Sequence, residues 1–214
     1  MLMNDTATLL LNPSKTANSY SQNGYSNIPQ ELKNLHQWVC FEVKLVKKDN
    51  GKVKLEKHPK NPHTGYNAKS DDPNTWGTFD DAVDGCIKHK LTHIGFALTK
   101  PYSGIDIDHC VDSNKKLTKT AQEVFDQFNG TYSEFSTSGT GIHIIVKGII
   151  PEGGRKNPKH GIEIYSKSRF FVFTGDVLNG HPNPILDQQE QLDTLYRTYF
   201  TREEISNQFI PPPS

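Results

Sequence analysis

Cysteine is scarce in this chain of 214 residues, which contains only three. Cys40, Cys86 and Cys110 are far apart in the sequence, and no C-x-x-C motif occurs. An odd number of isolated cysteines argues against a disulfide scaffold and a thiolate zinc site, and is typical of proteins in a reducing compartment. We therefore expect a cytoplasmic protein.

Long apolar runs are missing as well. The leucines at positions 9 to 11 form a run too short for a signal peptide, and Asp5 rather than a basic cluster precedes them. No stretch approaches the roughly 20 apolar residues of a transmembrane helix. The sequence thus predicts a soluble protein that has no membrane partner.

The chain has no excess charge of either sign, because 24 Lys and Arg residues balance 24 Asp and Glu residues. The molecule as a whole therefore does not attract nucleic acid, and any affinity for phosphate must come from local basic patches. With 34% hydrophobic and 22% charged residues, the composition is that of an ordinary soluble protein. The length fits one domain, or two small lobes that share a core.

Composition divides the chain into three parts. Residues 1–27 are rich in Asn, Ser, Thr and Gln without an apolar period, so we expect a disordered N-terminal tail. Residues 28–200 contain the regular patterns of a folded domain. Residues 201–214 contain a run of prolines and are predicted to form a C-terminal tail or a linker.

The hydrophobic patterns predict a mixture of helices and strands. Alternation over residues 39–45 and 53–55, on either side of a D-N-G turn, predicts a β-hairpin. Apolar residues at helical spacing predict helices over 79–87, 121–128 and 185–199. Residues 94–99 and 105–107 are expected to be neighbouring strands of one sheet. Further strands are expected over 142–146, 162–165 and 170–173.

Two aspartates stand out in the strand pattern G-I-D-I-D-H at residues 104–109. Successive side chains of a strand point to opposite faces, so the isoleucines enter a core while Asp106 and Asp108 share the other face. Neighbouring carboxylates repel each other unless a cation lies between them, and hard ions such as Mg²⁺ or Mn²⁺ prefer oxygen ligands. Taken alone, the pattern also fits a solvated strand face.

A second stretch, residues 136–146, joins a glycine-containing turn to a strand. Ser138 and Gly139 lie in the turn, where exposed backbone N–H groups can form an anion-binding nest. In the strand the apolar residues face one way and His143 the other, so its imidazole and the Ser138 hydroxyl could donate to a phosphate. The alternative is a plain β-turn followed by a histidine that pairs with a polar neighbour.

A third stretch supplies a glutamate and an arginine. Glu163 projects from the polar face of the strand over 162–165, and Arg169 is expected to open the next strand. Arginine suits a triphosphate because its charge is permanent and its donors form a fork, but the two residues could also pair across a hairpin. Upstream, Lys57 and Lys60 belong to a loop rich in Pro that either grips phosphate or serves as a connection.

Together these motifs resemble the catalytic domain of primase–polymerases of the archaeo-eukaryotic primase superfamily, in the form carried by phages, plasmids and other mobile elements. The similarity covers roughly residues 35 to 178. It rests on D-x-D at Asp106 and Asp108, S-G-x-G-x-H from Ser138 to His143, and the acidic Glu163. The resemblance implies an α+β fold in which an α/β lobe is fused to an RRM-like lobe, with the active site between them. Residues 28–200 would then be the catalytic domain.

The resemblance implies a template-dependent nucleotidyltransferase, that is a DNA primase, a DNA polymerase or both, in the replication of a mobile element. Asp106, Asp108 and Glu163 would be the catalytic residues and would hold two Mg²⁺ or Mn²⁺ ions. A 3′-hydroxyl would attack the α-phosphate of an incoming nucleotide, with release of pyrophosphate. The residues implied to bind the nucleoside triphosphate are Ser138, Gly139, His143, Arg169, Lys60 and Lys57.

Local basic clusters are the expected contacts for a single-stranded DNA template and primer, because phosphate contacts supply much of the affinity for nucleic acid. The hairpin contributes Lys52 and Lys54, and the segment before Glu163 contributes Arg155, Lys156 and Lys159. Family members are frequently joined to a helicase, so a replicative helicase is an expected partner, fused or in trans. The zinc-binding module of some primases has no counterpart, since the chain lacks a cysteine pair.

Two other functions fit parts of the pattern. A metal-dependent nuclease on an RRM-like core would use the same carboxylates, but hydrolysis of a diester has no need for Arg169 or for the Ser138-Gly139 turn. A non-catalytic nucleic-acid-binding module would keep only the fold, and the three intact carboxylates argue against such a decayed site.

Overall fold

The computed structural model describes residues 24–47, 51, 53–151, 153–178, 180 and 183–200 of the chain. Most of the expected N-terminal tail, two residues of the hairpin turn, Lys52 and residues 201–214 lie outside these described residues, as does the side chain of Lys54. The predictions made for them stay predictions. The described part begins near Tyr25 and Ile28, which are buried in the core.

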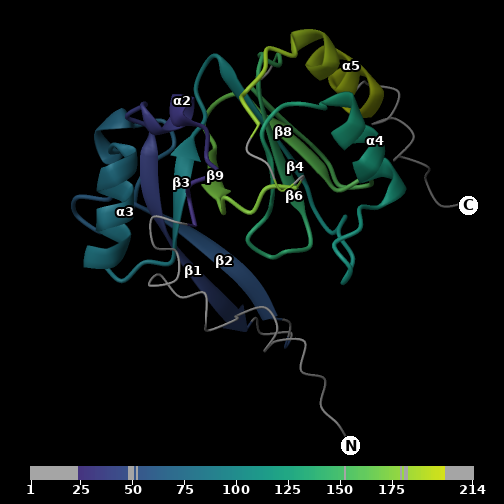
Figure 1. Ribbon diagram of the computed structural model, residues 1–214. Coiled ribbons are helices and arrows are strands. Elements are labelled where there is room, and N and C mark those ends of the chain that lie inside the picture. Colours follow the sequence, from purple (N-terminus) through teal and green to yellow (C-terminus); the bar gives the residue numbers. More distant parts are fainter. Residues whose placement is uncertain are drawn as a thin grey trace, which may run out of the picture.

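Two antiparallel sheets form the centre of the molecule (Figure 1). The first has the strand order β2-β1-β3-β9, and the second has the order β5-β6-β4-β8-β7. The strands of the first sheet are β1 (Trp38–Lys47), β2 (Val53–Lys60), β3 (His93–Ala97) and β9 (Phe170–Phe173). Those of the second are β4 (Tyr102–Ile107), β5 (Ser133–Phe135), β6 (Ile142–Lys147), β7 (Gly154–Asn157) and β8 (Ile162–Tyr165).

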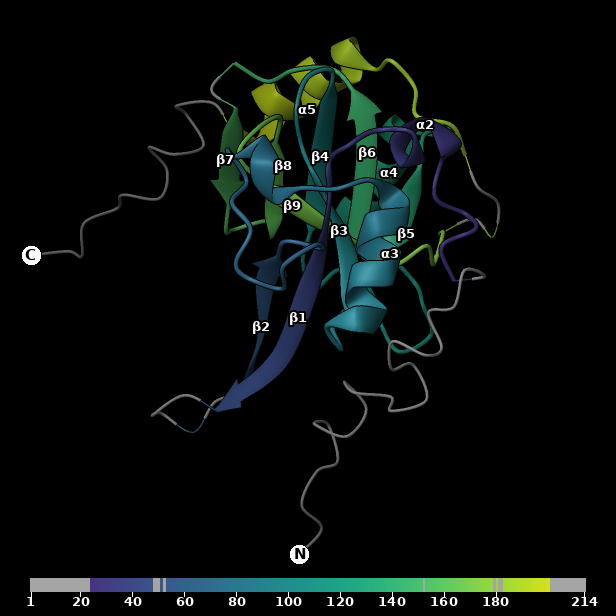
Figure 2. The ribbon, with the colours of Figure 1, turned by 90° about the vertical axis from the view of Figure 1, so that its left-hand side faces the viewer.

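The longer helices lie on the outer sides of the two sheets (Figures 1 and 2). The described helices are α2 (Gln30–Lys33), the 3₁₀ helix η2 (Pro73–Thr75), α3 (Phe79–Lys88), α4 (Lys119–Gln127) and α5 (Gln189–Phe200). None of these helices has the length and apolar character that crossing a membrane requires. Antiparallel sheets flanked by helices agree with the expected α+β class.

Alternation along the strands explains which face of the second sheet is covered. Ile105 and Ile107 on β4 are at most 1% exposed, and they form one cluster with isoleucines of β6 and β8 and with apolar residues of α4 and α5. Full burial of such a side chain stabilises a fold by roughly 1.5–3 kcal/mol. Gly104 and Asp106, which alternate with these isoleucines, therefore lie on the opposite face of the sheet. There Gly104 lies against the ring of Phe171 from the first sheet.

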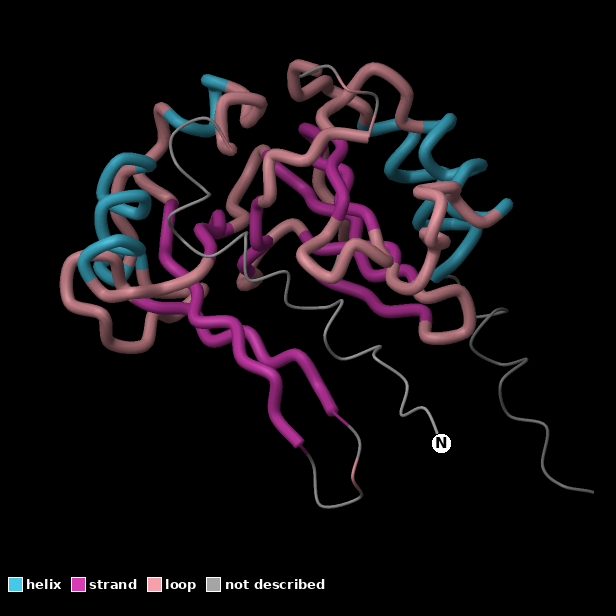
Figure 3. The backbone as a smooth tube through the Cα atoms, turned by 60° about the horizontal axis from the view of Figure 1, so that its bottom comes forward, coloured by secondary structure: helices cyan, strands magenta, loops and turns pink. Residues whose placement is uncertain are grey.

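The first sheet packs on both of its faces. On β1, Trp38 and Cys40 join the cluster that includes Ala82 of α3, whereas the alternate residue Phe41 joins a smaller cluster with Val172 of β9. The predicted β1–β2 hairpin is present, with paired residues from Cys40 to Lys47, and it projects from the rest of the molecule (Figure 3).

The expected pairing of strands 94–99 and 105–107 in one sheet is wrong. β3 pairs with β1 and β9, whereas β4 pairs with β6 and β8. The chain crosses from one sheet to the other between Ala97 and Tyr102. The physical reason is that Ile94 and Phe96 belong to the core around Trp38, while the isoleucines of β4 need the cover of α4 and α5.

Candidate active site

A row of polar residues crosses the second sheet on the face that its helices leave uncovered. Asp106 on β4 lies opposite His143 on β6 and opposite Glu163 on β8. The row continues with Glu134 on β5, opposite His143, and with Lys156 on β7, opposite Glu163. Residues directly opposite each other share a face, with Cβ atoms roughly 4.5–5.5 Å apart. Strand pairing thus brings four of the predicted site residues together, namely Asp106, His143, Glu163 and Lys156.

Asp106 is the central member of this row. Its side chain is only 21% exposed, and its Oδ1 atom is buried without a hydrogen-bond partner among the described residues. Burial raises the pKa of Asp106; His143 and Lys57 lower it in part, and the carboxylates of Asp108 and Glu163 raise it further. A buried acceptor without a donor is costly, and a bound cation would remove that cost.

His143 is held from its other side by Glu134, a residue that sequence reasoning missed. The imidazole Nδ1 lies 3.3 Å from Glu134 Oε1, and Nε2 lies 3.7 Å from Asp106 Oδ1. Both His143 and Glu134 are almost completely buried, and the ring of Phe171 meets the imidazole edge-on. The imidazole is therefore fixed between two carboxylates, and a hydrogen on Nδ1 suits the contact with Glu134.

Glu134 also connects the two sheets. Its Oε2 accepts hydrogen bonds from the backbone N–H groups of Thr174 and Gly175, at 3.0 and 2.8 Å, and from the Tyr132 hydroxyl at 2.7 Å. Thr174 and Gly175 directly follow β9 of the first sheet. The sequence signal that could have revealed Glu134 is a single charged residue within a short aromatic stretch just before the predicted phosphate turn.

The carboxylate of Glu163 makes three contacts. Lys156 Nζ donates to Oε1 at 2.6 Å, while the Tyr165 hydroxyl and the Arg169 guanidinium donate to Oε2 at 2.8 and 3.3 Å. Burial by itself would raise the pKa of Glu163, but the hydrogen bonds from Lys156 and Tyr165 and the nearby positive charges lower it. Arg169 lies in the turn before β9 rather than in that strand, and it pairs with Glu163. The pairing does not cross a hairpin, because β8 and β9 belong to different sheets.

Asp108 lies past the end of β4, in an exposed turn. Among the described residues, Asp106, Asp108 and Glu163 do not form a group whose carboxylate oxygens all lie within 4.8 Å of one another. The backbone of Asp108 packs closely against Gly161. Its N–H donates to the Gly161 carbonyl at 2.8 Å, and a Cβ at Gly161 would lie 3.0 Å from the backbone carbonyl oxygen of Asp108.

We expect Gly161→Ala to destabilise the protein more than Gly139→Ala does. Both glycines have positive φ, 66° and 70°, a conformation that costs an alanine roughly 1–2 kcal/mol. Only at Gly161 would the new methyl group meet the Asp108 carbonyl, since nothing lies within 4 Å of that position at Gly139. Thermal unfolding of both variants measures the difference. Equal melting temperatures would show that the Asp108 turn adjusts without cost.

The predicted phosphate turn occupies residues 136–141, between β5 and β6. Ser138 Oγ lies 3.0 Å from the hydroxyl of Ser136 and 2.9 Å from that of Thr140, and Gly139 is exposed. Neither Ser138 nor Gly139 lines the cavity that contains Asp106. A Cβ at Gly141, the last residue of the turn, would lie 3.5 Å from the Asp108 Cα, so the turn lies at the Asp108 end of the site.

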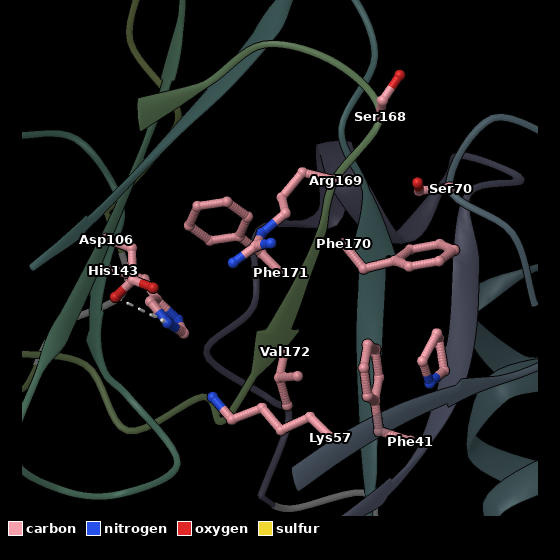
Figure 4. A pocket seen from close by; sticks show the side chains of 11 residues that line it. Phe41, Lys57, Ser70, Asp106, His143, Ser168, Arg169, Phe170, Phe171 and Val172 are labelled. Carbon is pink, nitrogen blue, oxygen red and sulfur yellow. Dashed lines mark ion pairs between the residues drawn. The ribbon is translucent and has the colours of Figure 1, made fainter. Parts of the chain in front are cut away.

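A cavity of about 290 Å³ lies beside the carboxylate row, between the two sheets (Figure 4). Asp106 and His143 line it from the second sheet, and Figure 4 shows the Lys57 amine and the Arg169 guanidinium directed toward them. Apolar residues complete much of the wall: Phe41, Pro59, Phe170, Phe171 and Val172. Two cationic groups thus face a carboxylate and an imidazole across a partly apolar hollow.

The two lysines predicted to bind phosphate point to different faces of β2. Lys57 lines the cavity. Loss of hydration lowers the pKa of its amine, although the residue as a whole is exposed. The negative charges of Asp106 and Asp108 raise the pKa and so oppose this effect. Lys60 is three residues further along the strand, so it faces the other way, where its amine donates to the Asn67 side chain at 2.9 Å. Only Lys57 is therefore part of the cavity.

The predicted DNA-contacting residues near β7 border a second hollow. Arg155 and Lys156 line a cavity of about 470 Å³ together with Lys167, and Lys159 is exposed in the turn that follows β7. Lys156 is also the partner of Glu163. This basic edge is thus directly connected to the carboxylate row.

Fold and site together define an α+β protein with a carboxylate-centred cavity between two antiparallel sheets. No family model matches the chain. The chain is 31% identical over 182 residues to the DNA primase-polymerase of Nitratiruptor phage NrS-1, in a match that covers 82% of this chain. The chain is therefore homologous to one part of this phage protein, which agrees with the resemblance that its three motifs predicted. The match spans 23% of the length of that relative.

Proposed function

We propose that the chain is the catalytic part of a template-dependent nucleotidyltransferase, a DNA primase, a DNA polymerase or both, in the replication of a mobile element. The observation that carries the proposal is the row of Asp106, His143 and Glu163 beside a cavity that also contains Lys57 and Arg169. The homology to a protein named as a primase-polymerase supports it. The finer fold assignment, an α/β lobe fused to an RRM-like lobe, belongs to the same proposal and is supported by a cavity between two sheets.

The carboxylates fit divalent metal ions. Asp106 offers a buried oxygen without a hydrogen-bond donor, and Asp108 and Glu163 add negative charge nearby. Hard oxygen ligands of this kind suit Mg²⁺ or Mn²⁺, so Asp106, Asp108 and Glu163 would hold the two ions. When bound, such ions activate an attacking 3′-hydroxyl and neutralise the charge that develops as pyrophosphate leaves the α-phosphate.

The residues of the chain itself position the nucleoside triphosphate. Lys57 and Arg169 place positive charge in the cavity, which is permanent in the case of Arg169. The Arg169 fork can exchange its contact with Glu163 for phosphate oxygens. His143, fixed by Glu134, turns Nε2 toward the cavity side of Asp106. Ser138 and Gly139 would meet phosphate at the Asp108 end, and we assign the phosphate contact of β2 to Lys57 rather than to Lys60.

The single-stranded template and the primer would lie along the basic edges. Arg155, Lys156 and Lys159 form one such edge, and the projecting hairpin, with Lys52 and Lys54 in its sequence, forms the other. Contacts to phosphate weaken steeply with salt, so template binding should do the same. A replicative helicase, fused or in trans, remains the proposed protein partner.

Extension of a labelled primer on a single-stranded DNA template tests the proposal, first with Mg²⁺ and then with Mn²⁺. Wild-type protein is compared with the Asp106→Ala, Asp108→Ala double variant, and a primer-free reaction runs in parallel. Growth of the primer by wild type alone establishes the polymerase, and products without primer add priming. Shortening of the primer would instead identify a nuclease. Template binding without any change in length would leave only a binding module.

Lys57→Ala and Lys60→Ala form a matched pair that tests the assignment on β2. Loss of a charge-assisted contact to the triphosphate should cost about 1.5–3 kcal/mol, so Lys57→Ala is expected to raise the KM for nucleotide roughly 10- to 100-fold. Lys60→Ala removes an equal charge from the face away from the cavity and should change KM less than about threefold. Steady-state extension kinetics measure both. Equal effects would remove Lys57 from its assigned role.

A further inference from the structure

A second group of metal-ligating side chains lies outside the carboxylate site. His36, His63 and Asp81 each offer one ligand atom, and these atoms all lie within 4.8 Å of one another. The three residues come from separate segments: His36 precedes β1, His63 follows β2, and Asp81 is in the first turn of α3. His63 Nε2 is 3.9 Å from Asp81 Oδ2. Tertiary structure alone brings them together.

Hydrogen bonds at His63 and next to His36 anchor the two segments that carry the imidazoles. The His63 backbone N–H donates to the Asn61 side chain at 2.8 Å, and its carbonyl accepts from Lys88 of α3 at 3.2 Å. Just after His36, Trp38 and Gly77 exchange backbone hydrogen bonds of 3.0 and 2.8 Å. The segments that carry the two imidazoles are therefore anchored close to α3.

Asp81 is oriented by the capping box of α3. Its Oδ2 accepts hydrogen bonds from the Thr78 backbone N–H at 2.8 Å and from the Thr78 hydroxyl at 2.6 Å. This same Oδ2 is the oxygen 3.9 Å from His63 Nε2, so a bound ion would either share Oδ2 with the cap or bind the second carboxylate oxygen. Hydrogen bonding of a ligating carboxylate is the usual arrangement around protein-bound metals, because it fixes the ligand before the ion arrives.

The exposed imidazoles can move from the present separation of up to 4.8 Å between ligand atoms to the shorter separation that a bound ion requires. Ligand atoms around a tetrahedral Zn²⁺ are about 3.3 Å apart, given Zn–N bonds of about 2.0–2.1 Å. His36 and His63 are exposed, so rotation of their side chains can bring the ring nitrogens this close without disturbing packed residues. Two imidazoles and one carboxylate leave at least one coordination position open to water or to another ligand.

We propose that His36, His63 and Asp81 bind one borderline divalent transition metal ion, with Zn²⁺ as the natural occupant. Imidazole ligands select Zn²⁺, Co²⁺, Ni²⁺ or Cu²⁺ over Mg²⁺ and Ca²⁺, the reverse of the preference at the carboxylate row. The group lies next to α3, which packs on the Cys40 face of the first sheet, whereas the cavity lies on the Phe41 face. A bound ion would join three segments and stabilise the first sheet with its helix.

Isothermal titration of the untagged full chain with Zn²⁺, and with Co²⁺ as a spectroscopic probe, tests this site. We expect one ion per chain with a Kd of about 10 μM or tighter and a rise in Tm of several degrees at saturating Zn²⁺. His36→Ala, His63→Ala and Asp81→Asn should each weaken binding at least tenfold. Asp81→Asn keeps an amide oxygen for the cap with Thr78, so loss of affinity there does not reflect loss of the helix cap.

Two control variants make the result decisive. His58→Ala removes a partly exposed histidine outside the group and should leave Zn²⁺ affinity unchanged. Asp106→Asn alters the carboxylate row and should also leave Zn²⁺ affinity unchanged. The test of this metal site is therefore independent of the test of the proposed polymerase. Circular dichroism of each metal-free variant verifies folding. Zn²⁺ binding that survives the loss of both His36 and His63, or a Kd weaker than about 1 mM, would overturn the proposal.

Discussion

Asp106→Asn is expected to abolish nucleotidyl transfer while leaving the protein at least as stable as wild type. Loss of one preorganised electrostatic contact commonly costs 10²–10³ in rate, so primer extension should fall by roughly 10²- to 10³-fold. Stability should not fall, because the wild-type carboxylate is buried, lacks a donor on Oδ1, and has a pKa that burial raises. An amide of the same shape removes the cost of the buried charge.

The stability gain of Asp106→Asn should depend on pH in a definite direction. Because the pKa of Asp106 is raised in the folded protein, the folded state binds more protons than the unfolded state between the two pKa values. Wild-type stability therefore falls as the pH rises from the ordinary aspartate pKa through the folded value. Thermal unfolding of both proteins across this range should show the advantage of the variant at neutral pH and its disappearance in acid.

Divalent metal ions provide the control for this prediction. Mg²⁺ or Mn²⁺ should raise the melting temperature of wild type by binding the folded state, and should raise that of Asp106→Asn far less. A variant that stays active, or that unfolds well below wild type at neutral pH without metal, would contradict the role assigned to this carboxylate.

Glu134→Gln is expected to cause the largest loss of stability among single isosteric changes at the site. The Glu134 carboxylate is fully buried and accepts hydrogen bonds from Thr174, Gly175 and Tyr132 besides contacting His143. The glutamine amide would set an N–H group against these donors. Breaking such a buried charged network should cost about 3 kcal/mol or more, which lowers the melting temperature by roughly 6–12 °C.

The matched control is Glu123→Gln on α4. Glu123 is an exposed carboxylate that lies 3.8 Å from Lys119 four residues earlier, so its loss should change stability by less than about 0.5 kcal/mol. Below the melting temperature, Glu134→Gln should also reduce extension roughly tenfold or more, because His143 loses the partner that fixes its ring. The ring ¹H–¹⁵N signals of His143 report that change directly, and unchanged signals in a stable variant would refute it.

Local periodicity predicted three members of the row that crosses the second sheet. Alternation with buried isoleucines identified Asp106 on β4, His143 on β6 and Glu163 on β8 as polar-face residues, and the structure places all three on one face in direct register. The same argument failed to separate Lys57 from Lys60. The face that each presents depends on the β2 strand register, and that segment was interpreted as a loop.

The local pattern shows Glu134 as a single charged residue in an aromatic stretch, but it does not show what the carboxylate binds. Its partners are the Tyr132 hydroxyl two positions earlier, a histidine nine positions later and backbone N–H groups 40 and 41 positions later. The pairing of Arg169 with Glu163 was similarly left open by the sequence, because either a phosphate or a carboxylate can satisfy a guanidinium. Only the fold determines which partner is within reach.

The sequence by itself determined most of the strands, the buried faces of β4, β6 and β8, and the three motifs with the family to which they point, because period-two alternation and glycine turns are properties of short segments. It did not predict the short strands β5 and β7, and it interpreted the second half of β2 as a loop. Tertiary structure decided which strands became neighbours, that β3 and β4 belong to different sheets, and that Lys57 and Arg169 meet Asp106 across a cavity. The physical reason is that strand pairing and sheet packing are selected by burial of the whole apolar surface. That surface is assembled from residues distant in sequence, so no single segment encodes it.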